Sequence, residues 1–442
     1  MGRRRKPRLP KEPVRLEVNA LSHEGRGIAQ VEGKTVFVHG ALPGEVVSAQ
    51  YTRRHRRYDE AKVLEVEKAA PERIEPRCPH FGNCGGCSLQ HLASERQIAF
   101  KQDVLLELLD HVGRVQPEQV LPPLQGPVWG YRRKARLAVK DVPRKGRVLV
   151  GFREKHSPYV ADMDSCDVLD PRLGHRLRAL SDLIAGLSRP DRIPQIEVAI
   201  GDNGAALVFR NLEPLTDADL TRLRDFGETH DLMILQQPGN EQTVAPVWPD
   251  QPELYYDVAG ERLHFRPTDF TQVNNALNLQ MVDRVLHMLD PGPADRVLDL
   301  FCGLGNFTLP LARKAGAVVG VEGDQALVER ARDNAARNGL GNAEFHMANL
   351  AEPVDHYPWA RADFNKVLLD PPRSGALEVL PQVAWFKPRR IVYVSCNPST
   401  LARDAGKLVH QYGYRLLEAG VMDMFPHTAH VESIACFELP NR

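Results

Sequence analysis

A cysteine and an aspartate each stand at the end of a predicted strand in the C-terminal part of the sequence. The apolar run 391–394 leads through Ser395 to Cys396, and Asn-Pro turns the chain directly afterwards. The run 367–369 has the same design, because it ends on Asp370 before two prolines. A thiol and an acid at two such ends predict covalent chemistry beside a bound cofactor. The alternative for Cys396 is a small buried core residue, which is the commoner fate of a free thiol.

Parallel strands would position these side chains, since α/β folds bind their ligands at the carboxyl ends of parallel strands. The strand 296–301 leads into the glycine turn 302–306, and the next strand ends on Glu322, 23 residues after Asp299. An acid about 20 residues past a glycine turn suits hydrogen bonding to ribose hydroxyls. The turn lacks the third glycine of the dinucleotide fingerprint. S-adenosylmethionine therefore fits this turn better than NAD does.

From about Phe265 to the C-terminus, the chain resembles the catalytic domain of the RNA (uracil-5-)-methyltransferases. The matching motifs, in order, are Phe270-Thr271-Gln272-Val273-Asn274, Asp299-Leu300-Phe301-Cys302-Gly303, Asp370-Pro371-Pro372-Arg373, Ser395-Cys396-Asn397-Pro398 and His430-Val431-Glu432-Ser433. The resemblance implies that S-adenosylmethionine is bound by Gln272, Phe301, Asn306, Glu322, Asn349 and Asp370. The residues alone would support only Glu322 and, less firmly, Asp370.

The same resemblance assigns the nucleophile to Cys396 and the general base to Glu432. Carbon 5 of uracil is a poor nucleophile, so a thiolate must first add at carbon 6, and a base must later remove the carbon 5 proton. Cysteine suits the first role because its thiolate is strongly nucleophilic. The alternative for Glu432 is a solvated residue on a terminal strand. Cys302, inside the cofactor turn, and Cys436, in an apolar run, are interpreted as packing residues.

Three further cysteines form a compact loop, Cys78-x5-Cys84-x2-Cys87, with glycines between them. Cys166 is a candidate fourth ligand. Disulfides are not expected, because the chain has 7 cysteines and no secretory segment precedes them. Four cysteines serve zinc and iron–sulfur clusters equally well, and the spacing does not separate them. The resemblance to the cluster-binding members of the family favours a 4Fe-4S cluster with a structural or RNA-shaping role.

The N-terminal region has the pattern of a small β-barrel, with short strands separated by turn glycines over residues 14–68. The phrase 23–29 resembles the start of a TRAM domain, an RNA-binding barrel similar to the OB fold. The alternative is a generic small β domain. Ser94 is expected to cap a helix that closes at Gly113.

Positive charge is segregated, although the formal net charge is +0. Three clusters stand out: Arg3, Arg4, Arg5, Lys6 and Arg8; Arg53, Arg54, Arg56 and Arg57; and Arg132, Arg133, Lys134 and Arg136. The second and third have neighbouring aromatic residues, which suits phosphate contact and base stacking. Each alone is more often a solvated face, but three of them beside a uracil-modifying motif set favour RNA.

The predicted fold class is α/β: a Rossmann-like S-adenosylmethionine-dependent methyltransferase domain, an N-terminal OB-like barrel (TRAM) and a central α+β domain. The expected bounds are a basic tail at 1–13, the barrel at 14–70, the central domain with the cluster at 71–93 and 126–262, and the catalytic domain at 94–125 and 263–442. No apolar run approaches the ~18 residues that a membrane span needs. A basic N-terminus without an apolar segment predicts the cytoplasm.

The barrel and the cysteine set together resemble the ribosomal branch of the family, which acts on 23S ribosomal RNA. That RNA is the expected partner, with no membrane, no obligate protein partner and a monomeric chain. A transfer-RNA uracil-5-methyltransferase is one alternative. Another is a non-catalytic iron–sulfur protein that binds RNA or assists assembly, although such a protein has no need of Cys396 and Glu432.

Overall fold

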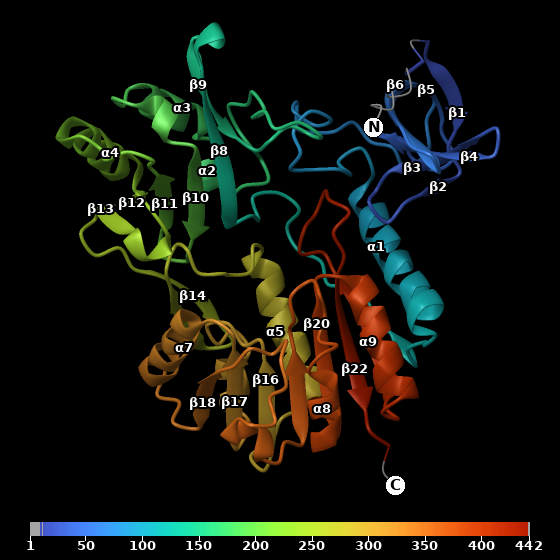
Figure 1. The fold of residues 1–442 in the computed structure, drawn as a ribbon, viewed down its shortest axis with the longest axis vertical. Helices are drawn as coiled ribbons and strands as arrows, with labels where there is room; N and C mark the ends of the chain where they lie inside the picture. The colour runs from blue at the N-terminus through green and yellow to red at the C-terminus, as the bar shows by residue number, and fades with distance from the viewer. Residues whose placement is uncertain (1–8, 11, 441–442) are drawn as a thin grey trace, which may run out of the picture. The chain divides into compact units, whose positions relative to one another are not determined.

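The structure is a computed structural model that describes residues 9–10 and 12–440. The chain divides into two compact units (Figure 1). The first combines the chain up to Lys101 with Arg153–Ser157 and Phe425–His430, and the second contains the remaining segments. Among the residues with a described structure, no helix has both the length and the apolar character needed to cross a bilayer.

The first unit contains a six-stranded sheet in the order β1-β5-β6-β4-β3-β2. Its strands are β1 (Val14–Glu17), β2 (Ala20–Leu21), β3 (Gly27–Val31), β4 (Lys34–His39), β5 (Val46–Arg54) and β6 (Tyr58–Lys68). Alternate side chains form a buried core that includes Leu16, Val36 and Val47. Strand β5 is longer than the short strands expected for this region, because it continues to Arg54 by pairing with the start of β6. The expected small β domain is therefore present.

A second six-stranded sheet lies in the middle of the chain, in the order β13-β12-β11-β10-β8-β9. Its strands are β8 (Lys134–Val142), β9 (Arg147–Gly151), β10 (Gln195–Ile200), β11 (Ala205–Arg210), β12 (Met233–Gln237) and β13 (Ala245–Trp248). The helices of this region are α2 (Pro171–Gly174), α3 (Leu177–Ala185) and α4 (Asp217–His230). Helix α3 packs on β9, and α4 packs on β12 and β13. This mixture of helices and mainly antiparallel strands is the expected α+β domain. A hairpin, β14 (Leu254–Val258) and β15 (Glu261–Phe265), follows it.

The third sheet has eight strands in the order β18-β17-β16-β19-β20-β22-β21-β7. They are β16 (Arg296–Leu300), β17 (Ala317–Glu322), β18 (Ala343–Met347), β19 (Lys366–Leu369), β20 (Arg390–Ser395), β21 (Arg415–Met422), β22 (Glu432–Glu438) and β7 (Gln119–Val120). Figure 1 labels β16, β17, β18, β20 and β22 in this sheet. The strands from β18 to β20 are parallel, while β22 is antiparallel to both of its neighbours. The chain passes from β16 to β17 and β18 on one side and then crosses back to β19 on the other side of β16, which creates the switch point where such sheets bind ligands.

The helices of this domain are α5 (Asn275–Leu289), α6 (Thr308–Ala312), α7 (Gln325–Arg337), α8 (Leu380–Phe386) and α9 (Pro398–His410). The predicted helix after Ser94 is also present as α1 (Ser94–Leu108), and one π-helical turn carries it to Gly113. A Cβ atom at Gly113 would lie 2.5 Å from the carbonyl oxygen of Ala402, so glycine is required for this close approach to α9.

Candidate active site

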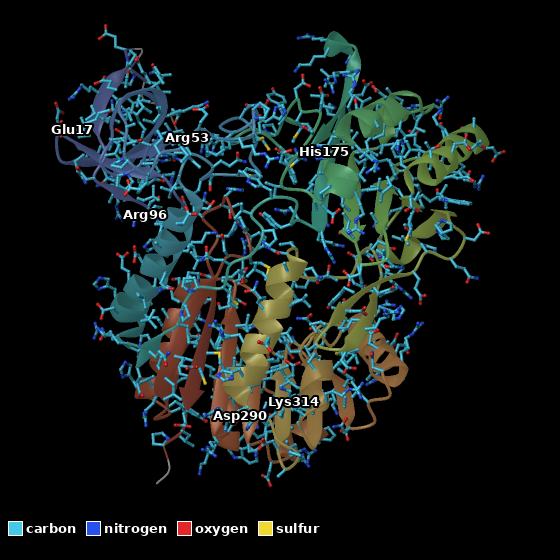
Figure 2. All side chains as sticks on the ribbon, turned by 180° about the vertical axis from the view of Figure 1, so that it is seen from behind. Glu17, Arg53, Arg96, His175, Asp290 and Lys314 are labelled. Carbon is cyan, nitrogen blue, oxygen red and sulfur yellow. The ribbon has the colours of Figure 1, made fainter. Side chains whose placement is uncertain are left out.

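Four strand ends bring the predicted functional residues to one edge of the eight-stranded sheet. The glycine turn follows β16, Glu322 ends β17, Asp370 follows β19 and Cys396 follows β20. These strands are parallel, so their carboxyl ends share an edge. Asp290 lies before the start of β16, and Lys314 lies before the start of β17. These two residues therefore mark the opposite edge of the sheet (Figure 2). The sequence prediction of four converging strand ends is confirmed.

The Cys396 thiol is half-buried and surrounded by charge. Burial raises its pKa to about 11, and the carboxylates of Glu432 and Asp370 add to this effect. The Arg373 guanidinium acts in the opposite sense and lowers the thiol pKa. The nearby charges therefore identify Glu432, Asp370 and Arg373 as the neighbours of the thiol.

Glu432 reaches the thiol through the antiparallel pairing of β22 with β20. The register joins Ser395 to Ser433, so the residues on either side, Cys396 and Glu432, lie at the same end of the strand pair. Glu432 is half-buried. Glu432 is the first residue of β22, in agreement with its predicted place on a terminal strand. Its carboxylate acts on the Cys396 thiol, which an ordinary solvated glutamate would not do.

Three carboxyl groups share the switch point. Asp299, on β16, is fully buried, and its Oδ2 accepts a hydrogen bond from the Thr308 hydroxyl over 2.6 Å. Burial raises the pKa of Asp299 to about 7, and repulsion from Asp370 and Glu322 adds to the rise despite the Thr308 bond. Burial, followed by repulsion from Glu322, also raises the pKa of Asp370 to about 7. A protonated carboxyl can donate a hydrogen bond at neutral pH, which a carboxylate cannot do.

The glycine turn is fixed by Glu322. One of its oxygens accepts the Gly303 backbone N–H over 3.0 Å, and the other accepts the N–H groups of Gly323 and Asp324 over 2.6 and 3.1 Å. Phe301 has a left-handed backbone with φ +67°, a strained conformation for a bulky side chain and one that clusters at functional sites. A Cβ atom at Gly303 would meet no described atom within 4 Å. The turn thus leaves open space beside the Glu322 carboxylate.

The other three predicted cofactor residues form contacts of their own. The Asn306 amide exchanges hydrogen bonds with Asn278 over 2.9 Å and accepts one from the Tyr256 hydroxyl over 3.0 Å. Asn349 is exposed after β18, and its side chain bonds to Glu352 and to the Ala351 backbone. Gln272 is half-buried in the segment that leads into α5. Within the part of the chain that the structure describes, none of these three side chains forms a hydrogen bond with Cys396.

Several supporting residues could not be found from the sequence. Tyr256 comes from the β14–β15 hairpin and Asn278 from α5, and no local pattern marks either as a partner of Asn306. The position of Thr308 at the start of α6, directly after the glycine turn, is a signal that the sequence does contain. Its hydrogen bond to Asp299 is known only from the structure.

Cys302 and Cys436 are both buried, as their interpretation as packing residues predicts. Burial raises the pKa of the Cys436 thiol to about 12 and that of Cys302 well above its ordinary value. Both side chains are shielded from solvent, whereas Cys396 is only half-buried.

The loop with Cys78, Cys84 and Cys87 belongs to the first unit, and Cys166 to the second. Within the described part of the chain, no three His, Cys, Asp or Glu side chains are gathered as a metal site. The loop nevertheless has features that suit anionic sulfur. The Gly86 N–H donates to the Cys84 sulfur over 3.4 Å, and Lys155 interacts electrostatically with Cys87 and Cys84. The donor chemistry of the loop fits a cluster.

The three basic clusters differ in their surroundings. The cluster at 3–8 lies outside the described residues. Arg53 is exposed on β5 (Figure 2), and Arg56 and Arg57 are exposed in the following turn. In the third cluster, Lys134 is largely buried and pairs with Glu197 over 3.2 Å. Of the four basic residues in this cluster, only Arg136 extends well into solvent. The third cluster is thus partly structural.

Comparison with known proteins agrees with this geometry. The tRNA (Uracil-5-)-methyltransferase family profile matches residues 250–438, and the TRAM domain profile matches residues 7–64. A solved structure, the Pyrococcus abyssi tRNA (uracil-54, C5)-methyltransferase in complex with S-adenosyl-L-homocysteine, shares the fold with a TM-score of 0.74. The two sequences are 24% identical, and the matched region covers 96% of this chain and 100% of the other.

Two curated relatives match along the whole chain. The 23S rRNA (uracil(1939)-C(5))-methyltransferase RlmD of Alkalilimnicola ehrlichii is 65% identical over 99% of each chain. The protein of the same name from Methylococcus capsulatus is 56% identical, over 99% of this chain and 100% of its own. The chain therefore belongs to the RNA (uracil-5-)-methyltransferase family, and within it to the group of 23S rRNA (uracil(1939)-C(5))-methyltransferases named RlmD.

Proposed function

We propose that this chain transfers a methyl group from S-adenosylmethionine to carbon 5 of a uridine in 23S ribosomal RNA, at the position that its relatives' name gives as 1939. The observation that carries the proposal is the placement of Cys396 and Glu432 at one end of paired strands, beside Asp370. A thiol and a carboxylate side by side match the two roles that methylation of carbon 5 requires.

The reaction follows from these two groups. The Cys396 thiolate adds to carbon 6 of the uracil, and the electron pair of the ring double bond moves onto carbon 5 and its neighbouring carbonyl. Carbon 5 then forms a bond to the sulfonium methyl group, while the methyl–sulfur bond breaks and its electron pair stays on the sulfur of the departing thioether. Glu432 next takes the carbon 5 proton, the electrons of that C–H bond restore the ring double bond, and the carbon–sulfur bond breaks to release the thiolate. Arg373 favours the thiolate form of Cys396 at both ends of this cycle.

S-adenosylmethionine, when bound, supplies the electrophilic methyl group. The open space at Gly303 and the Glu322 carboxylate beside it suit a nucleoside with free ribose hydroxyls. Asp370, held neutral in part by its raised pKa, is able to donate as well as accept a hydrogen bond. We assign Gln272, Phe301, Asn306 and Asn349 to the same site from the family resemblance.

The proposal is tested by mapping 5-methyluridine in ribosomal and transfer RNA by mass spectrometry. A strain without the gene should lack the methyl group at the position equivalent to 1939 of 23S RNA, and the wild-type gene should restore it while the Cys396→Ala gene should not. Loss of 5-methyluridine from transfer RNA instead would show a transfer-RNA enzyme. Restoration by the alanine variant would indicate a non-catalytic role.

We further propose that the cysteine loop binds a 4Fe-4S cluster through Cys78, Cys84 and Cys87, with Cys166 as the predicted fourth ligand. The Gly86 N–H at the Cys84 sulfur and the charge of Lys155 support an anionic sulfur centre in this loop. Anaerobically purified protein should contain about four irons per chain with matching sulfide. Stoichiometric zinc without sulfide would overturn this assignment and leave the methyltransferase assignment unaffected.

A further inference from the structure

The carboxylate of Asp404 is fully buried and accepts hydrogen bonds from three segments of the chain. Its Oδ2 accepts the Tyr393 hydroxyl over 2.7 Å and the Ala376 backbone N–H over 2.9 Å. Its Oδ1 accepts the Arg403 guanidinium over 2.8 Å. A buried charge that lost these partners would be costly, so the arrangement specifies a single position for each of them.

Each segment tied by Asp404 leads to a residue of the proposed active site. Tyr393 lies on β20, three residues before Cys396, and Asp404 lies on α9, which begins directly after Cys396-Asn397. Ala376 lies in the loop that starts at Asp370 and leads to α8 at Leu380. The Asp404 carboxylate therefore fixes the 370–376 loop to both elements that carry the nucleophile.

Two more hydrogen bonds fasten the same loop. The Asn397 side-chain amide donates to the Arg373 carbonyl over 3.0 Å, and Arg403 donates to the Ser374 carbonyl over 2.9 Å. The backbone of Gly375 has φ +84°, and a Cβ atom there would lie 2.6 Å from Arg403 Nη2 and 2.7 Å from Asp404 Oδ2. Glycine is therefore required for the loop to approach the carboxylate so closely.

We propose that Tyr393 and Asp404 are positioning residues that hold the 370–376 loop against the end of β20, so that Asp370 and Arg373 keep their places beside the Cys396 thiol. This inference rests on the proposed function. Tyr393 and Asp404 touch neither uracil nor cofactor in this role, and act through the loop. Displacement of the loop moves the charges of Asp370 and Arg373 away from the thiol while leaving the thiol itself in place.

The test compares Tyr393→Phe with a matched control, Tyr414→Phe. Each change removes one buried hydroxyl from the same domain, since the Tyr414 hydroxyl donates to the Pro388 carbonyl over 3.1 Å, at the opposite end of β20 from Cys396. The temperature of thermal unfolding should fall by a similar amount in both variants. The rate at which enzyme and a 23S RNA fragment containing 5-fluorouridine form a covalent adduct should fall about 10- to 100-fold in Tyr393→Phe only, as expected for misplaced reacting groups.

Two measurements and a second variant separate positioning from general destabilisation. Tyr393→Phe should lower the methylation rate at saturating RNA. The KM for RNA should change little. Iodoacetamide labelling of Cys396, followed by peptide mass spectrometry, should follow a pH profile shifted from the wild-type profile, because the Asp370 and Arg373 charges that act on the thiol pKa are displaced. Gly375→Ala, whose added methyl group would collide with Arg403 and Asp404, should give the same signature.

The inference is overturned if Tyr393→Phe forms adduct as fast as Tyr414→Phe, or if its Cys396 labelling profile matches the wild-type profile. A wild-type protein that forms no adduct at all would instead refute the proposed function. The two failures are therefore distinguishable in one set of measurements.

Discussion

Ser433 is the register partner of Ser395 in the antiparallel pair of β20 and β22, and its hydroxyl donates to the Ser395 carbonyl over 3.4 Å. The pairing sets the proposed nucleophile and the proposed base at one end of these strands, although Cys396 and Glu432 are 36 positions apart in the sequence. A change of register by one residue would direct the side chains to opposite faces. The proposed catalytic pair thus depends on strand register.

The first prediction concerns the titration of the thiol. Glu432 raises the pKa of Cys396, so Glu432→Gln should lower it and Arg373→Ala should raise it above about 11. The pH profile of Cys396 alkylation, measured by peptide mass spectrometry, should shift in these opposite directions. Profiles that shift together, or not at all, would show that these charges do not act on the thiol.

The second prediction concerns the order of steps. Glu432→Gln should permit thiol attack and methylation but stall at proton removal, because the carbon–sulfur bond cannot break while carbon 5 keeps its proton. A methylated protein–RNA adduct should accumulate with ordinary uridine RNA and be visible by denaturing electrophoresis with labelled methyl groups. Failure before any methyl transfer would instead give Glu432 a role in substrate placement.

The third prediction concerns the buried carboxyl of Asp299. Its Oδ1 has no hydrogen-bond partner among the described residues, and its pKa is raised to about 7, above the ordinary value near 4. The folded protein then binds more protons than the unfolded chain between these values, so this group lowers stability as pH rises from about 4 to about 7, with no further loss above.

Asp299→Asn removes that titration. Between pH 5 and 7, the unfolding free energy of the wild type should therefore fall more steeply than that of the variant, by up to about 1.4 kcal/mol per pH unit. Urea unfolding across this range measures both slopes. Equal slopes would mean that Asp299 is already ionised in the folded protein.

Much of the fold was predictable because its signals are local. The strands that end at Leu300, Glu322, Leu369 and Ser395 are mainly apolar runs followed by glycine, acid or proline, and their convergence follows from parallel sheet geometry. The length of β5 was missed because Thr52, Arg53 and Arg54 are polar, and they form a strand only through pairing with β6.

The interactions that set the chemistry of the site were less predictable. The partners of Asn306 come from a hairpin and a helix far away in the sequence. Similarly, the partial burial of Lys134 depends on Glu197, and a run of basic residues alone does not reveal it. Long-range pairing decides these cases, and a single sequence does not specify it.

The fourth prediction concerns RNA binding by the exposed cluster after β5. Replacing Arg53, Arg56 and Arg57 by alanine should weaken binding to a 23S RNA fragment and flatten its dependence on salt, because each phosphate contact contributes about 0.7–0.9 to the slope of log K against log salt. Filter binding at several salt concentrations measures this effect. Arg224→Ala, on the exposed side of α4, is the matched control. An unchanged slope in the triple variant would exclude the cluster from RNA contact.

The most direct test of the covalent mechanism is adduct formation with a 23S RNA fragment that contains 5-fluorouridine at the target position. Fluorine cannot leave as a proton does, so the carbon–sulfur bond should persist after methylation. In the presence of S-adenosylmethionine, wild-type enzyme should give a stable protein–RNA species whose linked peptide contains Cys396, and Cys396→Ala should give none. A stable species in the alanine variant, or a link through another cysteine, would contradict the mechanism.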